Sequence, residues 1–436
     1  MLKYVVVMAV SLALAVSGAV GLARNEEPAA TASAVLAAPN PLSASGADPA
    51  AAVAALEAQV ERVPRDHRAW AELGFAYFSL AGEELDAELF DQADRAIERS
   101  LEIAPDDNVR ALANQAAISA SHHQFVDALD QAEATLAIAP YDPTALAIRI
   151  DALTQLGRFA DLMPAVREAD RRQPGVPVVS RWSYAVELDG RLEEARRILL
   201  RGTGSASRDE LSHLLSHAAD LDRRQGRLRA AARRLDRADA AAPGDVDVQV
   251  GRALLAQARG DLAEARRTWQ GVVRSDPLPE HYLALGELLE HLGRDAEAAA
   301  AYDRSREAVD LLASGGANID GELAQFLVDH GEVADRAEAL ALGRAEATRS
   351  RGVHASDAYA WALHASGRHR QALTYARLAT RRGTQEAILW IHRGTIEAAL
   401  GRDAAARRHL RAGIAMDPGL SPWQVARARE VLEGLG

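Results

Sequence analysis

Residues 279–308 read PEHYLALGELLEHLGRDAEAAAAYDRSREA, and this stretch decides the fold. It contains two runs of good helix formers, separated by Gly293 and preceded by Pro277 and Pro279. Apolar residues recur three and four positions apart in each run, which predicts two amphipathic helices joined by a glycine turn. Proline ends the helix that comes before it. The stretch is therefore predicted to be one helical hairpin.

The same markers recur along most of the chain. Prolines that follow a helical run are 35, 34 and 34 residues apart, from 105 to 140, from 140 to 174 and from 243 to 277. Turn glycines between two helical runs recur at Gly157, Gly190, Gly226, Gly260, Gly293, Gly331, Gly367 and Gly401. One hairpin cannot bury its apolar face alone, so a period of about 34 residues predicts a stack of hairpins.

This pattern resembles the tetratricopeptide repeat (TPR) residue by residue. The matching residues are Tyr282, Leu285, Gly286, Leu289, Ala298 and Tyr302 in the repeat quoted above, Trp70, Leu73, Gly74, Tyr77, Ala93, Ile97 and Pro105 in the first repeat, and Trp390, Gly394, Ala406, Leu410 and Pro418 in the last. The resemblance covers residues 48–436. It implies an all-α fold, an α-solenoid of about ten helix-turn-helix repeats that winds into a right-handed superhelix.

The repeats are predicted to start near residues 67, 108, 143, 177, 210, 246, 279, 318, 354 and 386. Residues 48–64 and 422–436 are predicted to be N- and C-terminal capping helices, the second with Trp423 and Val425 facing inward. Three places break the period: an insertion at 81–90, a junction without a closing proline at 201–210, and a Gly-Gly pair at 315–316. We expect loops there.

The whole layout also resembles a group of bacterial TPR proteins that are exported or membrane-anchored and have no assigned chemistry. The resemblance lies in the long first repeat and in three stretches, LPEH (278–281), NIDGELAQFLVDHG (318–331) and RRGTQEAILW (381–390). It supports the fold and gives no mechanism.

The N-terminus suggests export. Residues 4–22 carry no charge, and as a helix these nineteen residues would span about 28 Å, close to the thickness of the bilayer core. Lys3 precedes the run and Glu26 and Glu27 follow it, which favours an N-terminus inside and the remainder outside. We therefore expect residues 1–23 to be a signal peptide or a single transmembrane anchor. Residues 24–47 are expected to form a disordered linker rich in Ala, Pro and Ser, and residues 48–436 are expected to form the solenoid. The repeats are expected outside the cytoplasm, membrane-anchored, or secreted if the segment is cleaved.

Composition excludes several function classes. The net charge of −12 argues against a nucleic-acid partner and against adsorption to anionic lipid, so membrane contact is expected only through the N-terminal segment. The absence of cysteine removes disulfides, thiolate metal sites and cysteine nucleophiles. There is no P-loop, dinucleotide-binding motif or nucleophile elbow, and we expect no enzyme activity and no cofactor.

The resemblance implies that a protein partner lies in the concave groove lined by first helices. The partner-binding positions carried over to the sixth and seventh repeats are Asp247, Leu254, Gln257, Glu280, Leu283, Glu287, Glu290 and His291. The glutamates among them favour a partner segment that is basic or amphipathic. The alternative is that they form an ordinary hydrated surface without a ligand. A subgroup of the family holds a C-terminal carboxylate with a Lys, Asn and Arg clamp. Ala71 and Phe75 occupy clamp positions here, so that specificity is not implied.

Two other functions remain open. On the fifth repeat, His213, His217 and Asp220 share one helix face at spacings of four and three, a pattern that can bind Zn²⁺. A second hypothesis is that the groove binds a metal, a small molecule or a polysaccharide. A third is an enzyme site in the groove or loops. The leading hypothesis is an extracytoplasmic scaffold for protein–protein interaction.

Overall fold

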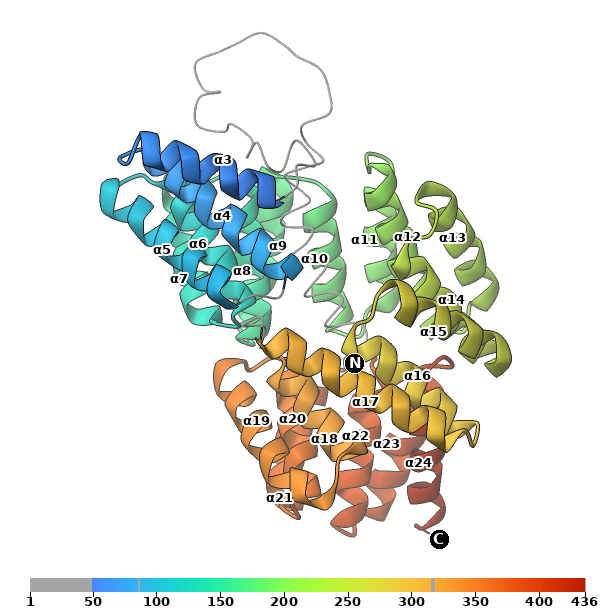
Figure 1. Cartoon of the computed structure of the whole chain (residues 1–436). Coiled ribbons are helices and arrows are strands. Elements are labelled where there is room, and N and C mark those ends of the chain that lie inside the picture. Colours follow the sequence, from blue (N-terminus) through green and yellow to red (C-terminus); the bar gives the residue numbers. More distant parts are fainter. Residues whose placement is uncertain (1–48, 85–86, 315–317, 436) are drawn as a thin grey trace. The chain divides into compact units, whose positions relative to one another are not determined.

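The computed structural model describes residues 49–84, 87–314 and 318–435. In these ranges the chain consists of helices α3 to α24, one short 3-10 helix η2 (Val333–Asp335), and the turns between them (Figure 1). The predicted N-terminal segment (1–23) and the linker (24–47) lie outside the described residues. None of the helices in the described ranges combines the length and the apolar character needed to cross a bilayer.

The described helices form ten hairpins between α3 (Pro49–Arg62) and α24 (Pro422–Glu433), which confirms the predicted repeats and both predicted caps. The first helices are α4 (His67–Glu84), α6 (Val109–Ser121), α8 (Pro143–Gln155), α10 (Val176–Glu187), α12 (Arg208–Arg224), α14 (Val246–Arg259), α16 (Pro279–His291), α18 (Asp320–His330), α20 (Val353–Ala365) and α22 (Ala387–Ala399). The second helices are α5 (Ala87–Ile103), α7 (Phe125–Ile138), α9 (Phe159–Arg172), α11 (Leu192–Gly202), α13 (Leu228–Ala241), α15 (Leu262–Ser275), α17 (Asp295–Ser314), α19 (Arg336–Arg349), α21 (His369–Thr380) and α23 (Asp403–Met416).

The chain divides into two compact units, with the boundary inside α10. The first unit contains α3 to α9 and α10 as far as Arg181, and the second contains Trp182–Asp310 and the chain from Ile319 onward. In each unit a hairpin packs on its neighbours along the sequence. In the second unit, for example, Trp269 of α15 is fully buried against Leu285 and Leu289 of α16, the first helix of the next repeat.

Glycines of the first helices let the paired second helix approach. A Cβ added to Gly286 would lie 2.7 Å from Tyr302 Cδ1, and one added to Gly74 would lie 2.7 Å from Ile97 Cδ1. Real Cβ atoms do not come this close to a carbon, so no larger residue fits without moving its neighbour. Since Gly74 and Gly286 are repeat-signature positions, the match to the repeat reflects helix packing.

The turn glycines behave as predicted, with one exception. Seven have left-handed backbone with φ between 66° and 77°, namely Gly157, Gly190, Gly226, Gly260, Gly293, Gly367 and Gly401. Gly331 has φ −85° and is followed by η2 instead of a tight glycine turn. In the second repeat, which has no turn glycine, His123 takes the left-handed conformation with φ 57°.

The three irregular places differ in outcome. The insertion at 81–90 was expected to form a loop, but α4 continues to Glu84 and α5 begins at Ala87, so most of the extra residues lengthen the two helices. The junction at 201–210 is non-helical between Gly202 and Arg208, and Ser207 forms a capping box with Glu210 that starts α12. The Gly-Gly pair at 315–316 lies outside the described residues.

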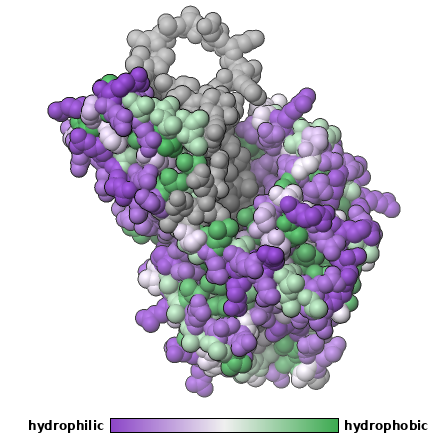
Figure 2. All heavy atoms as spheres, in the orientation of Figure 1, coloured by the Kyte–Doolittle hydropathy of each residue, from purple (hydrophilic) through white to green (hydrophobic). Residues whose placement is uncertain are grey.

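On the face shown in Figure 2, polar residues cover most of the surface and apolar residues form small scattered groups.

Candidate binding surface on the first helices of the second unit

The predicted partner-binding residues come from α14 and α16, two adjacent first helices of the second unit. Their environments differ widely. His291 is exposed at the end of α16, whereas Gln257, Glu280 and Glu287 are buried. Asp247, Leu254, Leu283 and Glu290 are half-buried. The buried members show that part of this surface is already covered, and Gln257 and Glu287 contact the C-terminal end of the same unit.

The turn between α23 and α24 lies on α12 and α14. Asp417 forms an ion pair with both terminal nitrogens of Arg223, one of them at 3.2 Å from Oδ2. Gln257 Nε2 donates to the main-chain oxygen of Gly419 at 3.1 Å. Burial alone would raise the pKa of Asp417, but the Arg223 guanidinium outweighs it and holds that pKa below its ordinary value. Asp417 is therefore ionised and paired at neutral pH.

A second C-terminal segment, between α21 and α22, contacts the end of α10 and α12. Arg224 donates to Glu187 Oε2 at 3.0 Å and also to the main-chain oxygen of Gln385. The Thr384 hydroxyl donates to the main-chain oxygen of Leu188 at 2.7 Å. These hydrogen bonds join repeats four and five to repeats nine and ten, so contacts within the second unit are not limited to successive hairpins.

On α16, Glu287 is the centre of a third contact. Gln424 of α24 donates to Glu287 Oε1 at 2.9 Å, and His330 Nε2 lies 3.4 Å from the same oxygen. The His330 ring also packs on Trp423, with 4.6 Å between ring centroids. Burial would raise the pKa of Glu287, but the contacts with His330 and Gln424 outweigh it, and the pKa is lowered. The capping helix thus packs on three first helices, α16, α18 and α22.

The other glutamates of the predicted acidic cluster also have internal surroundings. Glu290 accepts a hydrogen bond from the Tyr302 hydroxyl at 2.7 Å. Burial, with small contributions from Glu322 and Asp276, raises the pKa of Glu280 to about 7. Near neutral pH, Glu280 is therefore partly protonated, and the cluster carries less negative charge than its sequence suggests.

The candidate metal ligands of α12 do not converge on one point. Each turns to a different neighbour: His213 Nδ1 lies 3.4 Å from Asp247 Oδ2, His217 Nε2 lies 3.8 Å from Glu187 Oε1, and Asp220 Oδ1 accepts from Arg223 at 2.8 Å. In the described part of the chain, no group of three or more histidine and carboxylate side chains has an arrangement that could hold a metal ion.

A family model described as tetratricopeptide repeat matches residues 250–311, which include most of α14 and all of α15 and α16. The same hairpin geometry repeats ten times in the described chain, with the signature glycines at the helix contacts. The chain is therefore an α-solenoid of tetratricopeptide repeats. Repeats of this kind generally mediate protein–protein interactions, and the proteins that carry them are generally scaffolds without catalytic activity.

Several solved structures are similar to this TPR protein. A structure of pilF from Pseudomonas aeruginosa is 17% identical, with a TM-score of 0.39 over 49% of this chain and 94% of that chain. A thermophilic TPR protein from Thermus thermophilus is 20% identical, with a TM-score of 0.36 over 42% and 95%. Yeast Tom70 is 13% identical, with a TM-score of 0.35 over 83% and 95%. No curated protein sequence matches the chain.

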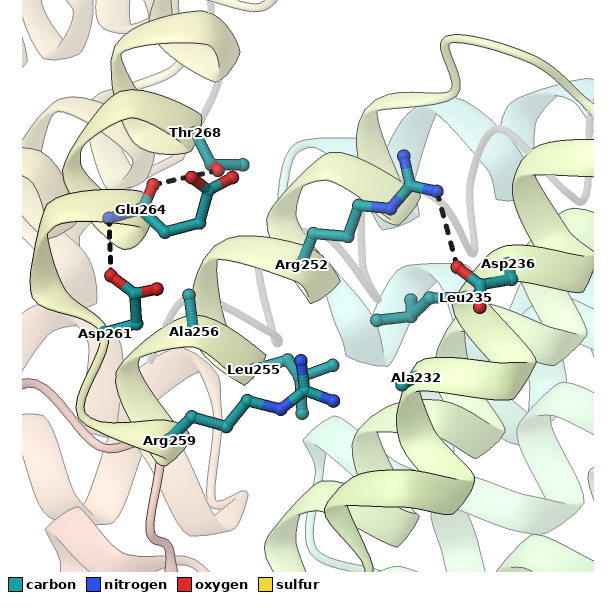
Figure 3. Close-up of a pocket in the computed structure, with 10 residues that line it drawn as sticks. All are labelled: Ala232, Leu235, Asp236, Arg252, Leu255, Ala256, Arg259, Asp261, Glu264 and Thr268. Atoms are coloured by element: carbon teal, nitrogen blue, oxygen red, sulfur yellow. Dashed lines mark hydrogen bonds and ion pairs between the residues drawn. The ribbon is translucent and has the colours of Figure 1, made fainter.

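The TPR protein also has a small pocket beside α14. It has a volume of about 230 Å³ and lies between α13, α14 and α15 (Figure 3). Figure 3 shows Arg252 reaching from α14 toward Asp236 of α13, at 3.7 Å, while Asp261 accepts from the main-chain nitrogen of Glu264. Asp236 and Arg252 thus pair within the lining, Thr268 donates to the main-chain oxygen of Glu264 at 3.0 Å, and the apolar lining includes Leu235, Leu255 and Ala256.

The residues that cover the surface could not be predicted from the sequence. Arg223 lies on α12, the first helix of the fifth repeat, and Asp417 and Gly419 flank Pro418, the signature proline of the last repeat. Gln424 was part of the predicted cap. The contacts join residues 194 and 162 positions apart, for Arg223 with Asp417 and Gln257 with Gly419. No short-range sequence signal marks pairs at such separations.

Proposed function

We propose that this TPR protein is an extracytoplasmic scaffold that binds a segment of a partner protein on the first-helix surface of α12, α14 and α16. One observation carries the proposal. Side chains of this surface already hold polypeptide main chain, because Gln257 donates to the carbonyl of Gly419 and Arg224 to the carbonyl of Gln385. Hydrogen bonds to main-chain carbonyls are available to any extended segment, whatever its side chains.

The exposed end of α16 supplies the position for a binding test. His291 is exposed there, and Arg304 is exposed on the second helix α17 of the same repeat. A photo-crosslinking amino acid would replace each residue in turn in the full chain, expressed in its own cells. We expect a discrete crosslinked protein at position 291 and none at position 304. Equal crosslinking at both positions, or none at 291, would contradict binding on the first-helix surface.

The location outside the cytoplasm rests on the uncharged run at 4–22. It is tested separately by fusing alkaline phosphatase, which is active only outside the cytoplasm, to the C-terminus of the full chain. We expect an active fusion and expect deletion of residues 4–22 to abolish the activity. An inactive fusion at normal expression would rule out export. The mass of the mature N-terminus would then distinguish an anchor from a cleaved signal.

A further inference from the structure

We propose that residues 417–419 are an internal ligand of the surface formed by α12 and α14, and that the partner segment which competes with them is extended and acidic. The segment reads Asp-Pro-Gly and belongs to the turn that precedes the capping helix α24. The inference rests on the proposed function and adds to it the chemistry of the bound segment and the competition for it.

The first element of recognition is a carboxylate. Arg223 is 3% exposed and uses both of its terminal nitrogens on the two carboxylate oxygens of Asp417. Asp220, three residues earlier on the same helix, accepts from Arg223 Nη2 at 2.8 Å and holds the guanidinium in place. The planar fork of arginine matches a carboxylate in geometry as well as in charge. The site therefore selects an acidic side chain.

The second element is main chain. Trp269 Nε1 donates to Gln257 Oε1 at 2.6 Å, which leaves the Gln257 amide nitrogen to donate to the carbonyl of Gly419. A Cβ on Gly419 would clash with Arg223 and would lie 2.8 Å from the main-chain oxygen of Leu254. The site thus accepts a carboxylate followed, two residues later, by a residue without a side chain. This pattern differs from the basic or amphipathic segment that the acidic residues of α16 favour.

The contacts of residues 417–419 allow a separate peptide to replace them on α12 and α14. Its contacts to α12 and α14 are an ion pair and hydrogen bonds at the ends of helices, while α23 and α24 are held in the stack by their own packing. A covalently linked segment competes at an effective concentration on the order of millimolar. A separate acidic peptide should therefore bind the wild-type chain weakly and bind much better once the internal segment is displaced.

The test uses the full chain and a labelled peptide AMDPGLSPWQ, which has the sequence of residues 415–424. Gly419→Val removes the internal segment sterically and leaves Arg223 and Gln257 intact. Gly204→Val is the matched control, because a Cβ at Gly204 meets nothing within 4 Å. By fluorescence anisotropy, we expect Gly419→Val to bind the peptide at least about tenfold more tightly than wild type or the Gly204→Val control.

Two further variants test the chemistry. A peptide with Asn in place of its Asp should bind Gly419→Val about tenfold more weakly, and Arg223→Gln combined with Gly419→Val should bind neither peptide. Asp417→Asn, a milder change, should also increase peptide affinity and replaces Gly419→Val if circular dichroism shows that variant to be unfolded.

Equal affinity of the wild-type chain and the opened variants, or indifference to the Asp-to-Asn change in the peptide, would overturn the inference. If the peptide test fails but a crosslink still forms at position 291, the inference is wrong and the proposed function is not contradicted. If no crosslink forms at position 291, the proposed partner binding is contradicted, even if the peptide still binds.

Discussion

The carboxyl group of Glu280 gives the sharpest prediction about stability. Its side chain lies at the start of α16, 9% exposed, and among the described residues its Oε1 has no hydrogen-bond partner. Burial, with Glu322 and Asp276 nearby, raises its pKa to about 7 from an ordinary value of 4.5. Because the folded chain binds this proton more tightly than the unfolded chain, the stability contributed by Glu280 is complete below about pH 4.5 and is lost as the pH rises through about 7.

The magnitude follows from the shift. At about 1.4 kcal/mol per pKa unit, ionising Glu280 in the folded state costs on the order of 3 kcal/mol at pH 8. Gln cannot ionise and has nearly the same shape. Glu280→Gln should therefore be more stable than wild type by up to about 3 kcal/mol at pH 8, and the difference should shrink toward zero near pH 4.5.

The assay is urea unfolding followed by circular dichroism at several pH values between about 4.5 and 8, with hydrogen exchange of α16 as a local readout. Glu338→Gln, at an exposed position on α19, is the control for loss of one negative charge. A Glu280→Gln effect that is the same at both ends of the pH range would refute the reasoning, as would an equal effect of Glu338→Gln.

Three further predictions concern the second unit. Burial and the nearby His369 and His392 lower the pKa of His364 to about 4, so the stability that this residue contributes is lost as the pH falls from about 6.5 to 4. His364→Gln should reduce this loss by about 3 kcal/mol in acid unfolding, and an acid unfolding curve that does not change would refute the prediction. Gly286→Ala should destabilise the chain by about 1–2 kcal/mol in urea unfolding despite the helix propensity of Ala, and a stabilised variant would show that the ring of Tyr302 moves freely. Trp269→Phe leaves the oxygen of the Gln257 side chain without its donor and should cost about 1–3 kcal/mol, which thermal unfolding would show; no change in Tm would refute it.

The sequence predicted the repeat fold well because its signals are local. A hairpin is specified by helix formers, a residue that adopts positive φ and a proline within about 34 positions, and each hairpin packs on the next. Gly286 and Gly394 could be identified from their match to the repeat signature, and both lie against the paired second helix. The extra length of the first repeat was visible in the sequence, but its form was not, since residues 81–90 are compatible with either a loop or longer helices.

The candidate site was less predictable. The sequence placed Gln257 and Glu287 on first helices, where the structure has them, but could not show that both would be covered by the C-terminal repeats. Nor could it show that burial would raise the pKa of Glu280, because the pKa depends on which elements pack around the carboxyl group.

By itself, the sequence determined the helical class, the length of the repeat, the number of hairpins and the two caps, since each of these depends on neighbours along the chain. The tertiary structure alone decided that Arg223 meets Asp417 and that Gln257 meets Gly419, across 194 and 162 residues. Such pairs depend on the small rotation of each repeat, accumulated over five of them, and no single residue encodes that sum.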